Sequence, residues 1–311
     1  MKFLKKYSFV IGIFLFLFIL SRLDFSYYRD LAQRINIAKF ILVCCIFLAT
    51  LFLQSYRWLK LMEVQGIHYS FWQSFSMYQV SKFVGLFTPG RIGETSKVLY
   101  LAKDYSTGKS FVSIVLDRLF DVVFLLLAGF WGMFLFLRIF KGGILIFFIF
   151  VFSLFLLPFI IWKSVSARGI LKRVFYFFLP QKYHNKWQTN FRDFIVGLKS
   201  YNAGHYAYAF FLTLVIWYVY YVAIYLFACD IGIKMPFFYF SSALSLASLI
   251  AFLPISIAGI GTRDAALLAM FSVFNVSKEL TIAVSMLVLF LIFLSAFVGL
   301  LCWIKKPFFR D

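Results

Sequence analysis

The sequence predicts an all-α polytopic membrane protein. Of its 311 residues, 63% are hydrophobic and 23% aromatic, and the mean hydropathy is +0.92. Soluble domains are only about half apolar. Uninterrupted apolar runs such as Ile144–Ile161 are long enough to cross a bilayer as helices, whereas a β-barrel would alternate apolar and polar residues in segments of about 10. We therefore expect residues 1–311 to form a single transmembrane domain.

Six apolar runs predict full crossings: Tyr7–Leu23, Phe40–Tyr56, Phe111–Leu137, Ile144–Trp162, Tyr206–Ala228 and Thr281–Ile304. The first run is not followed by a small-residue cleavage site, so we expect a retained anchor. Ser70–Lys103 and Phe237–Phe274 each hold two shorter helices around a break rich in Pro and Gly. Each pair enters and leaves on one side of the membrane, whether it is re-entrant or fully crossing. The predicted side of every other loop is therefore unchanged.

The basic charge of the chain indicates its topology. A formal net charge of +19 comes from 31 Lys and Arg against 12 Asp and Glu. With the N-terminus inside, most of these cations fall in cytoplasmic segments, among them Arg57 and Lys60, although 22–39 opposes the rule. We therefore expect a multi-pass protein of the cytoplasmic (inner) membrane with both termini cytoplasmic, and no nucleic-acid partner.

The largest polar segment, 163–205, mixes Arg and Lys with Phe, Tyr and Trp. This composition predicts a basic amphipathic helix on the cytoplasmic surface, bound to anionic lipids of the inner leaflet. The segment is too short for a catalytic domain.

Three landmarks recur in the two halves of the chain, 1–138 and 143–304. They are Gly66–Phe71 with Gly232–Phe237, Ile92–Gly93 with Ile260–Gly261, and Gly108–Lys109 with Ser277–Lys278, at offsets of about 166 to 169 residues. Each half has three full spans and one broken helix pair. An odd number of net crossings places the halves in opposite orientations, so the sequence predicts two inverted repeats.

The first break, Phe87–Lys97, places three charges among helix-breaking residues, and the last of them is Lys97. Pro89, Gly90 and Gly93 surround Arg91 and Glu94 between two apolar segments. Irregular backbone at membrane depth survives only where protein or a water-filled cavity satisfies its polar groups, so the break is expected to line an interior site. A short interfacial loop whose charges meet lipid headgroups is the alternative.

A second charged cluster lies inside a predicted span. Asp117 and Asp121 share a helix face, and Arg118 is expected to reach Asp121 at i,i+3. Each charge costs about 2.5–3.5 kcal/mol at a helix centre, so the cluster must face protein or water. It forms either a structural ion-pair latch or the polar wall of a headgroup cavity. That cavity would also be lined by Arg91, Glu94 and Arg263. Lys82 is a weaker candidate, because it can extend to the interface.

The two breaks together resemble a known family. Thr88–Glu94 followed by Pro254–Asp264 is similar to the paired signature of the lysylphosphatidylglycerol synthase transmembrane, or flippase-like, family, and the resemblance covers nearly the whole chain. It implies a flippase module, either alone or working with a lipid synthase or with a glycosyltransferase that handles polyprenyl-linked sugars. Ala258–Gly259 stands where the family commonly has Gly-Gly, and Asp264 stands where it has Glu.

The expected function is translocation of a polar-headgroup lipid, such as an aminoacyl-phospholipid or a polyprenyl-phosphate-linked sugar. Helix N-termini after the breaks, together with arginines, can hold its phosphate. The expected headgroup-binding residues are Pro89, Gly90, Arg91, Gly93, Glu94, Gly259, Gly261, Arg263 and Asp264, and the expected cavity cluster is Asp117, Arg118, Asp121 and Lys82. No enzymatic activity, metal or cofactor is expected, because the chain has no nucleotide-binding Gly-rich loop and no histidine near these clusters. A membrane-embedded lipid-modifying transferase and a non-transporting partner of a glycosyltransferase or lipid synthase remain the alternatives.

Overall fold

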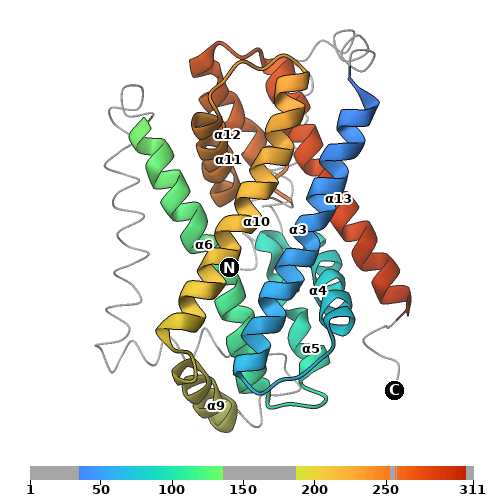
Figure 1. Cartoon of the computed structure of the whole chain (residues 1–311), viewed down its shortest axis with the longest axis vertical. Helices are drawn as coiled ribbons and strands as arrows, with labels where there is room; N and C mark the ends of the chain where they lie inside the picture. The colour runs from blue at the N-terminus through green and yellow to red at the C-terminus, as the bar shows by residue number, and fades with distance from the viewer. Residues whose placement is uncertain (1–34, 136–186, 253–255, 257, 306–311) are drawn as a thin grey trace, which may run out of the picture.

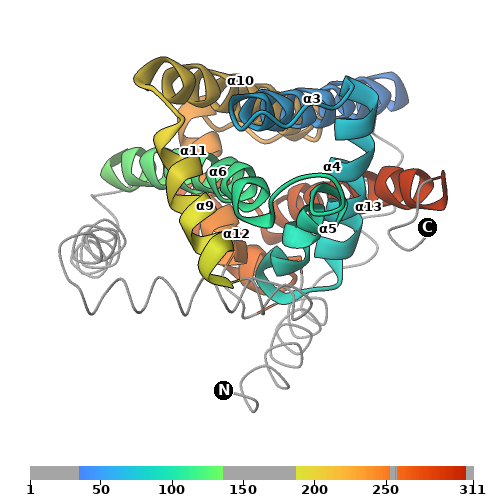
Figure 2. The ribbon, with the colours of Figure 1, turned by 90° about the horizontal axis from the view of Figure 1, so that it is seen from below.

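The structure, a computed structural model, describes residues 35–135, 187–252, 256 and 258–305 (Figures 1 and 2). This part of the chain is a bundle of helices without a strand. Its elements are α3 (Ile37–Val64), α4 (Phe71–Leu86), the 3-10 helix η1 (Pro89–Ser96), α5 (Lys97–Leu101), α6 (Thr107–Leu135), α9 (Trp187–Lys199), α10 (Ala203–Asp230), α11 (Phe237–Phe252), α12 (Thr262–Phe271), the 3-10 turn η3 (Ser272–Phe274) and α13 (Lys278–Lys305).

Polar side chains fix where several helices begin. The Asn36 side chain accepts a hydrogen bond from the backbone at the start of α3. Ser70 and Gln73 form a capping box at α4, and Asn202 and His205 form another at α10. Because these caps satisfy backbone N–H groups that the first helical turn leaves unpaired, they set where each helix starts, and α3 and α10 begin before the apolar runs predicted there.

Each of the four predicted spans in the described part is a helix, and three of these helices, α3, α10 and α13, are long and apolar enough by themselves to cross a membrane. The fourth is α6, which carries the charged cluster. The runs Tyr7–Leu23 and Ile144–Trp162 lie outside the described residues. One boundary was wrong: α3 continues to Val64, so Arg57 lies inside a helix and not in a cytoplasmic loop.

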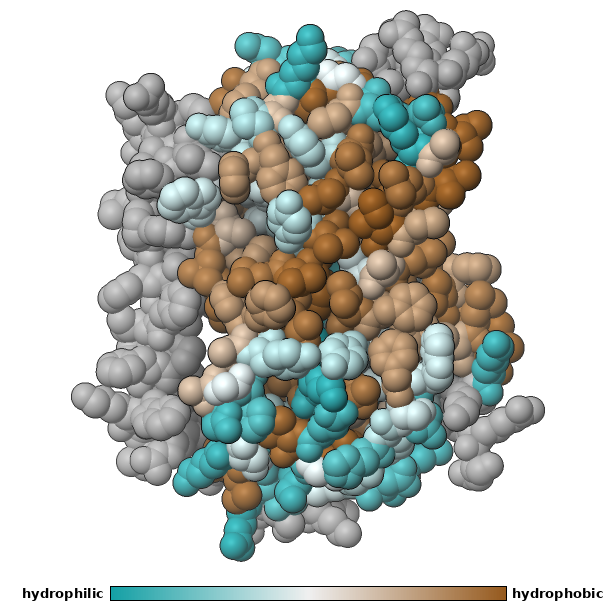
Figure 3. All heavy atoms as spheres, viewed as in Figure 1, coloured by the Kyte–Doolittle hydropathy of each residue, from teal (hydrophilic) through white to brown (hydrophobic). Residues whose placement is uncertain are grey.

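The exterior is apolar across the middle of the molecule. Figure 3 shows a hydrophobic band between two more hydrophilic ends. Large side chains exposed on the long helices include Phe211, Tyr218, Phe290, Phe293 and Phe297. Such a surface is unfavourable in water and favourable against acyl chains, as expected for a membrane protein.

Helix α9 is the described part of the predicted surface segment, and it is tied to the ends of α3 and α6. The Gln65 side-chain amide donates to the Gly197 carbonyl at 2.8 Å, and the Tyr201 hydroxyl donates to the Leu61 carbonyl at 2.6 Å. Phe194 is buried against this end of the bundle, while the Arg192 and Lys199 side chains of α9 are exposed. The helix therefore carries the chain across one end of the bundle to α10.

The helices pack in a regular pattern. α3 lies along α10, α4 packs against α13, and α6 packs against α11. α3 and α10 run in opposite directions, and so do α6 and α13 (Figure 1). The pair α4 and α5 lies at the lower end of the bundle in that view, and the pair α11 and α12 lies at the upper end. The two broken regions therefore enter the bundle from opposite ends.

The contact between α4 and α13 depends on a glycine. A Cβ atom on Gly299 would lie 2.2 Å from the backbone oxygen of Gln79 and 2.9 Å from the Cβ of Phe83. Backbone cannot move away as an exposed side chain can, so the two helices approach this closely only because position 299 lacks a side chain.

We expect Gly299→Ala to lower the free energy of unfolding by about 1–3 kcal/mol, because the added methyl group forces α4 and α13 apart. Unfolding in mixed detergent micelles measures the change. Leu301→Ala, on the same helix at an exposed position, is the control and should change stability by less than about 0.5 kcal/mol. Equal effects of the two substitutions would contradict the close contact.

Candidate functional site

The first break is shaped by its contacts with the end of α4. Pro89 and Gly90 begin η1. The Gly93 N–H donates to the Thr88 hydroxyl at 2.7 Å, and a Cβ on Gly93 would lie 2.7 Å from the Val84 carbonyl oxygen. Gly93 therefore lets η1 fold back onto α4. Because Gly93 has no side chain, the backbone packs closely here, and the next residue, Glu94, lies in the interior.

Glu94 is buried and forms ion pairs with two arginines. Its Oε2 lies 2.5 Å from Arg118 Nη2, and its Oε1 lies 4.0 Å from Arg91 Nη1. Arg118 also donates to the Tyr78 hydroxyl at 3.1 Å. The expected pairing of Arg118 with Asp121 is wrong: Arg118 reaches across to the first break, because the face of α6 that carries Asp121 is turned toward another partner.

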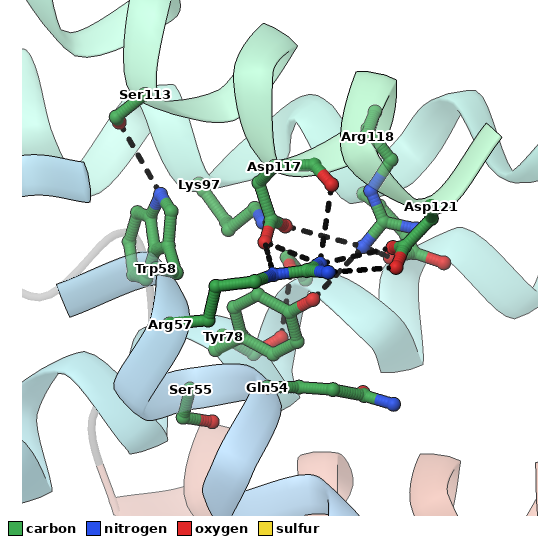
Figure 4. Close-up of polar contacts among 12 residues, drawn as sticks. Gln54, Ser55, Arg57, Trp58, Tyr78, Lys97, Ser113, Asp117, Arg118 and Asp121 are labelled. Atoms are coloured by element: carbon green, nitrogen blue, oxygen red, sulfur yellow. Dashed lines mark hydrogen bonds and ion pairs between the residues drawn. The ribbon is translucent and has the colours of Figure 1, made fainter. Parts of the chain in front are cut away.

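That partner is Arg57, which is fully buried (Figure 4). Its Nη2 lies 2.8 Å from Asp117 Oδ1, and its Nη1 lies 2.9 Å from Asp121 Oδ1. Nη1 also donates to the Thr213 hydroxyl of α10 at 2.7 Å. The two carboxylates share one face of α6, as predicted, and one planar guanidinium binds both. Arg57 thus joins α3, α6 and α10.

Lys97 encloses Asp117 from the other side. Its Nζ lies 3.0 Å from Asp117 Oδ2. The same ammonium lies 4.0 Å from the ring centroid of Tyr78 and 4.8 Å from that of Trp58, within the range of cation–π attraction. Because Asp117, Lys97 and Arg57 are all fully buried, this part of the cluster is a buried ion-pair network, and Asp117 Oδ2 also lies 3.5 Å from Arg118 Nη2.

Asp121 differs from Asp117, because it also lines a cavity. Its Oδ1 accepts a hydrogen bond from Trp217 Nε1 at 3.1 Å in addition to the Arg57 contact. The two alternatives for the cluster, latch and cavity wall, therefore apply to different carboxylates. Asp117 belongs to the latch, and Asp121 connects the latch to the cavity.

The second break satisfies its own charges. Asp264 accepts a hydrogen bond from the Gly261 N–H at 2.8 Å and thereby caps α12. Arg263 donates to the Ser285 hydroxyl at 3.0 Å and lies 3.4 Å from Asp264. Both side chains are buried. Phosphate binding at the helix N-termini after the breaks stays a prediction. Asp264 already occupies the start of α12, and α5 after the first break has only 5 residues.

Ala258 adopts a backbone conformation that favours glycine. Its φ is +54°, and Gly259 follows at +77°. A Cβ on Gly259 would lie 2.6 Å from the Cβ of Ala251 on α11. Ala258 therefore carries backbone strain of about 1–2 kcal/mol, which a glycine at this position would avoid.

The cavity has a volume of about 120 Å³, enough for several water molecules, and lies where α3, α4, α6, α10, α11 and α13 meet. Its polar lining consists of Gln54, Tyr78, Lys82, Arg91, Glu94, Arg118, Asp121, Trp217, Tyr220, Ser248, Arg263 and Ser295. Its apolar lining consists of Phe47, Leu86, Ile216, Ala251, Phe252, Ala258, Val288, Leu291 and Ile292. Both breaks thus contribute to one site.

Six predicted site residues line this cavity: Lys82, Arg91, Glu94, Arg118, Asp121 and Arg263. Lys82 donates to the Gln54 side-chain oxygen and does not extend to the interface. Asp117 and Asp264 are buried beside these residues, and Gly93 and Gly259 allow close backbone packing at the breaks. Gly261 is the N-cap of α12.

Two fully buried cations, Arg57 and Lys97, are not among the predicted site residues. Arg57 follows an apolar run, at a position where arginines commonly meet lipid headgroups, so the sequence favours a loop charge there. Lys97 is the last charged residue of the first break, and its position in the sequence does not distinguish it from a lysine at the membrane interface. A clearer signal in the sequence is the pair Asp117 and Asp121. Two carboxylates inside a predicted span need more than one nearby cation.

Comparison with known proteins identifies a family. The family model described as the lysylphosphatidylglycerol synthase TM region matches residues 7–301. Neither a curated protein nor a solved structure matches the chain.

We expect Arg57→Gln to destabilise the protein by about 3–5 kcal/mol, because it leaves two buried carboxylates without their shared partner. In a double-mutant cycle with Asp117→Asn, the coupling energy should reach about 1–3 kcal/mol. The cycle of Arg118→Gln with Asp121→Asn is the matched comparison and should show weaker coupling. Equal coupling in both cycles would contradict the pairing described above.

Ala258→Gly should raise the free energy of unfolding by about 0.5–1 kcal/mol, because glycine adopts the positive φ without strain. Ala265→Gly, at an exposed position within α12, is the control and should lower stability by about 0.5–1 kcal/mol. Chemical unfolding of both variants measures the two changes. Destabilisation by both substitutions would show that residue 258 is not strained.

Proposed function

Because the chain belongs to the family of lysylphosphatidylglycerol synthase transmembrane regions, we propose that it moves a polar-headgroup lipid between the leaflets of the cytoplasmic membrane. Membership of this family indicates a function related to membrane lipids. The observation that carries the proposal is the charged cavity inside a bundle whose exterior is apolar. A cavity of this kind is suited to a molecule with a polar head and apolar tails.

The chemistry of the lining supports this function. A polar headgroup loses its hydration when it enters a bilayer, and that cost prevents spontaneous exchange between leaflets. Lys82 and Arg91 offer charged partners in place of water, and the aliphatic residues beside them can accept the first part of an apolar chain. The remainder of the tails can stay in the surrounding lipid. The protein then lowers the cost of moving the head without enclosing the whole lipid.

The arrangement of the helices supports an inverted repeat. If α3, α4 and α6 correspond to α10, α11 and α13, a two-fold rotation exchanges the contact of α4 with α13 for the contact of α11 with α6. The same rotation exchanges the two breaks, which enter from opposite ends (Figure 1). In inverted repeats, movement of one half against the other opens a shared site to alternate sides. We propose this repeat, with six full spans and cytoplasmic termini, as the architecture of the transport cycle.

Leaflet exchange in reconstituted liposomes tests the function. We expect the protein to exchange a labelled lipid without changing it chemically, and Arg91→Ala to slow exchange at least tenfold with little change in stability. Arg192→Ala, at an exposed position on α9, is the control and should exchange normally. Arg263→Ala should lower stability as well as exchange, because its side chain is buried with Ser285 and Asp264.

Other results would assign another function. A chemically altered lipid would indicate a lipid-modifying transferase. An absence of both exchange and product, from folded protein, would indicate a partner of a lipid synthase or glycosyltransferase. Normal exchange by Arg91→Ala would remove that arginine from the site.

A further inference from the structure

The charges that line the cavity do not balance. By formal charge, four cationic side chains and two carboxylates line it, an excess of two positive charges: Lys82, Arg91, Arg118 and Arg263 against Glu94 and Asp121. The charged groups paired directly behind this lining do balance, because they comprise two cations and two carboxylates: Arg57 and Lys97 with Asp117 and Asp264. Within the described part of the chain, the excess charge of the site is therefore uncompensated.

The excess resides on Lys82 and Arg91. Lys82 Nζ donates to the neutral side-chain oxygen of Gln54, and no ion pair of Lys82 occurs among the described residues. Arg91 lies 4.0 Å from Glu94, at the limit of an ion pair, with 34% of its side chain exposed. By contrast, Arg118 holds Glu94 at 2.5 Å. Lys82 and Arg91 are thus the cations available to a ligand.

The carboxylates of the lining are already occupied. Glu94 is held by Arg118, and Asp121 is held by Arg57 at 2.9 Å and by the Trp217 N–H at 3.1 Å. A cationic headgroup would find no free carboxylate and would meet Lys82 and the weakly paired Arg91, which is a repulsive arrangement. The chemistry of the site therefore favours an anion.

A hydroxyl group supplies a third contact. Ser295 of α13 is 6% exposed and lines the cavity, yet its Oγ has no hydrogen-bond partner within the described structure. One helical turn further along, Gly299 meets the backbone of Gln79 on α4, so Ser295 lies at the crossing of the two helices. Buried hydroxyls are normally hydrogen-bonded, and this one can donate to a ligand oxygen.

We propose that the cavity binds a lipid phosphate carrying about two negative charges, such as a phosphate monoester or a diphosphate on an apolar chain. Lys82 supplies a point charge, Arg91 a planar pair of donors, and Ser295 a neutral donor. This inference rests on the proposed function, whose substrate class it names. A doubly charged phosphate matches the excess of two positive charges, whereas an aminoacyl-phospholipid brings a cation to the same place.

Ligand-induced shifts in melting temperature and titrations of the purified chain in detergent test the proposal. Farnesyl phosphate is the lipid probe, and inorganic phosphate, inorganic pyrophosphate and lysylphosphatidylglycerol are the comparisons. Farnesyl phosphate should stabilise the protein, and Lys82→Met should weaken its binding at least tenfold. Lys82→Arg should retain most of the affinity. Lys234→Met, which removes an exposed lysine from the loop before α11, is the control and should bind normally.

Ser295→Ala separates a ligand contact from a structural role. Without ligand, its melting temperature should be unchanged or raised, because the substitution removes a buried hydroxyl that lacks a partner. Its affinity for farnesyl phosphate should fall severalfold. A lowered melting temperature with unchanged affinity would remove Ser295 from the site.

Two results would overturn the proposal: tighter binding of lysylphosphatidylglycerol than of farnesyl phosphate, or unchanged phosphate binding in Lys82→Met. Inorganic phosphate or pyrophosphate binding as tightly as farnesyl phosphate would assign the site to a free anion and overturn the lipid assignment. Exchange assays keep this inference distinct from the proposed function. If lipid exchange does not depend on Lys82, the protein is a flippase with another substrate. If phosphate binding depends on Lys82 but no lipid is exchanged, the cavity is a phosphate site without transport.

Discussion

The buried guanidinium of Arg57 connects three helices, α3, α6 and α10, at the centre of this protein. It binds Asp117 and Asp121 of α6 and Thr213 of α10 from its position on α3. This contact fixes the rotation of α6, because both carboxylates must face α3. The next residue, Arg118, is then directed toward the first break, where it pairs with Glu94. The contacts of Arg57 thereby determine which charged groups are paired inside the protein and which remain available at the cavity.

The charged side chains of the site range from fully buried and paired to partly exposed. Asp117 and Lys97 are fully buried and paired, Asp121 touches both the network and the cavity, and Arg91 is partly exposed. Buried pairs cost desolvation and add little net stability, but removing one partner is expensive. The buried network therefore restricts the conformations of α3, α6 and α10, and the partly exposed end keeps charge available for a ligand. A cavity lined only by satisfied pairs would have no charge left for recognition.

The two breaks, although similar in sequence, differ in chemistry. The second is self-contained, because Asp264 caps its own helix and Arg263 bonds to Ser285. The first leaves Arg91 extended toward the cavity beside Phe252 of the other break. Recognition of the headgroup is accordingly expected to come mainly from the first break and α4. The second break contributes shape, through the positive-φ residues Ala258 and Gly259.

The sequence by itself determined the membrane helices, both breaks, the family and the shared face of Asp117 and Asp121, because apolar length, helix-breaking residues and i,i+4 spacing are local properties. Only the tertiary structure decided the partners. Arg57 and an interfacial arginine look alike at the end of an apolar run, and Arg118 has acceptors on its own helix and across the bundle. Which of these a long side chain reaches depends on how the helices pack and rotate against one another, and that is set by contacts between residues distant in sequence.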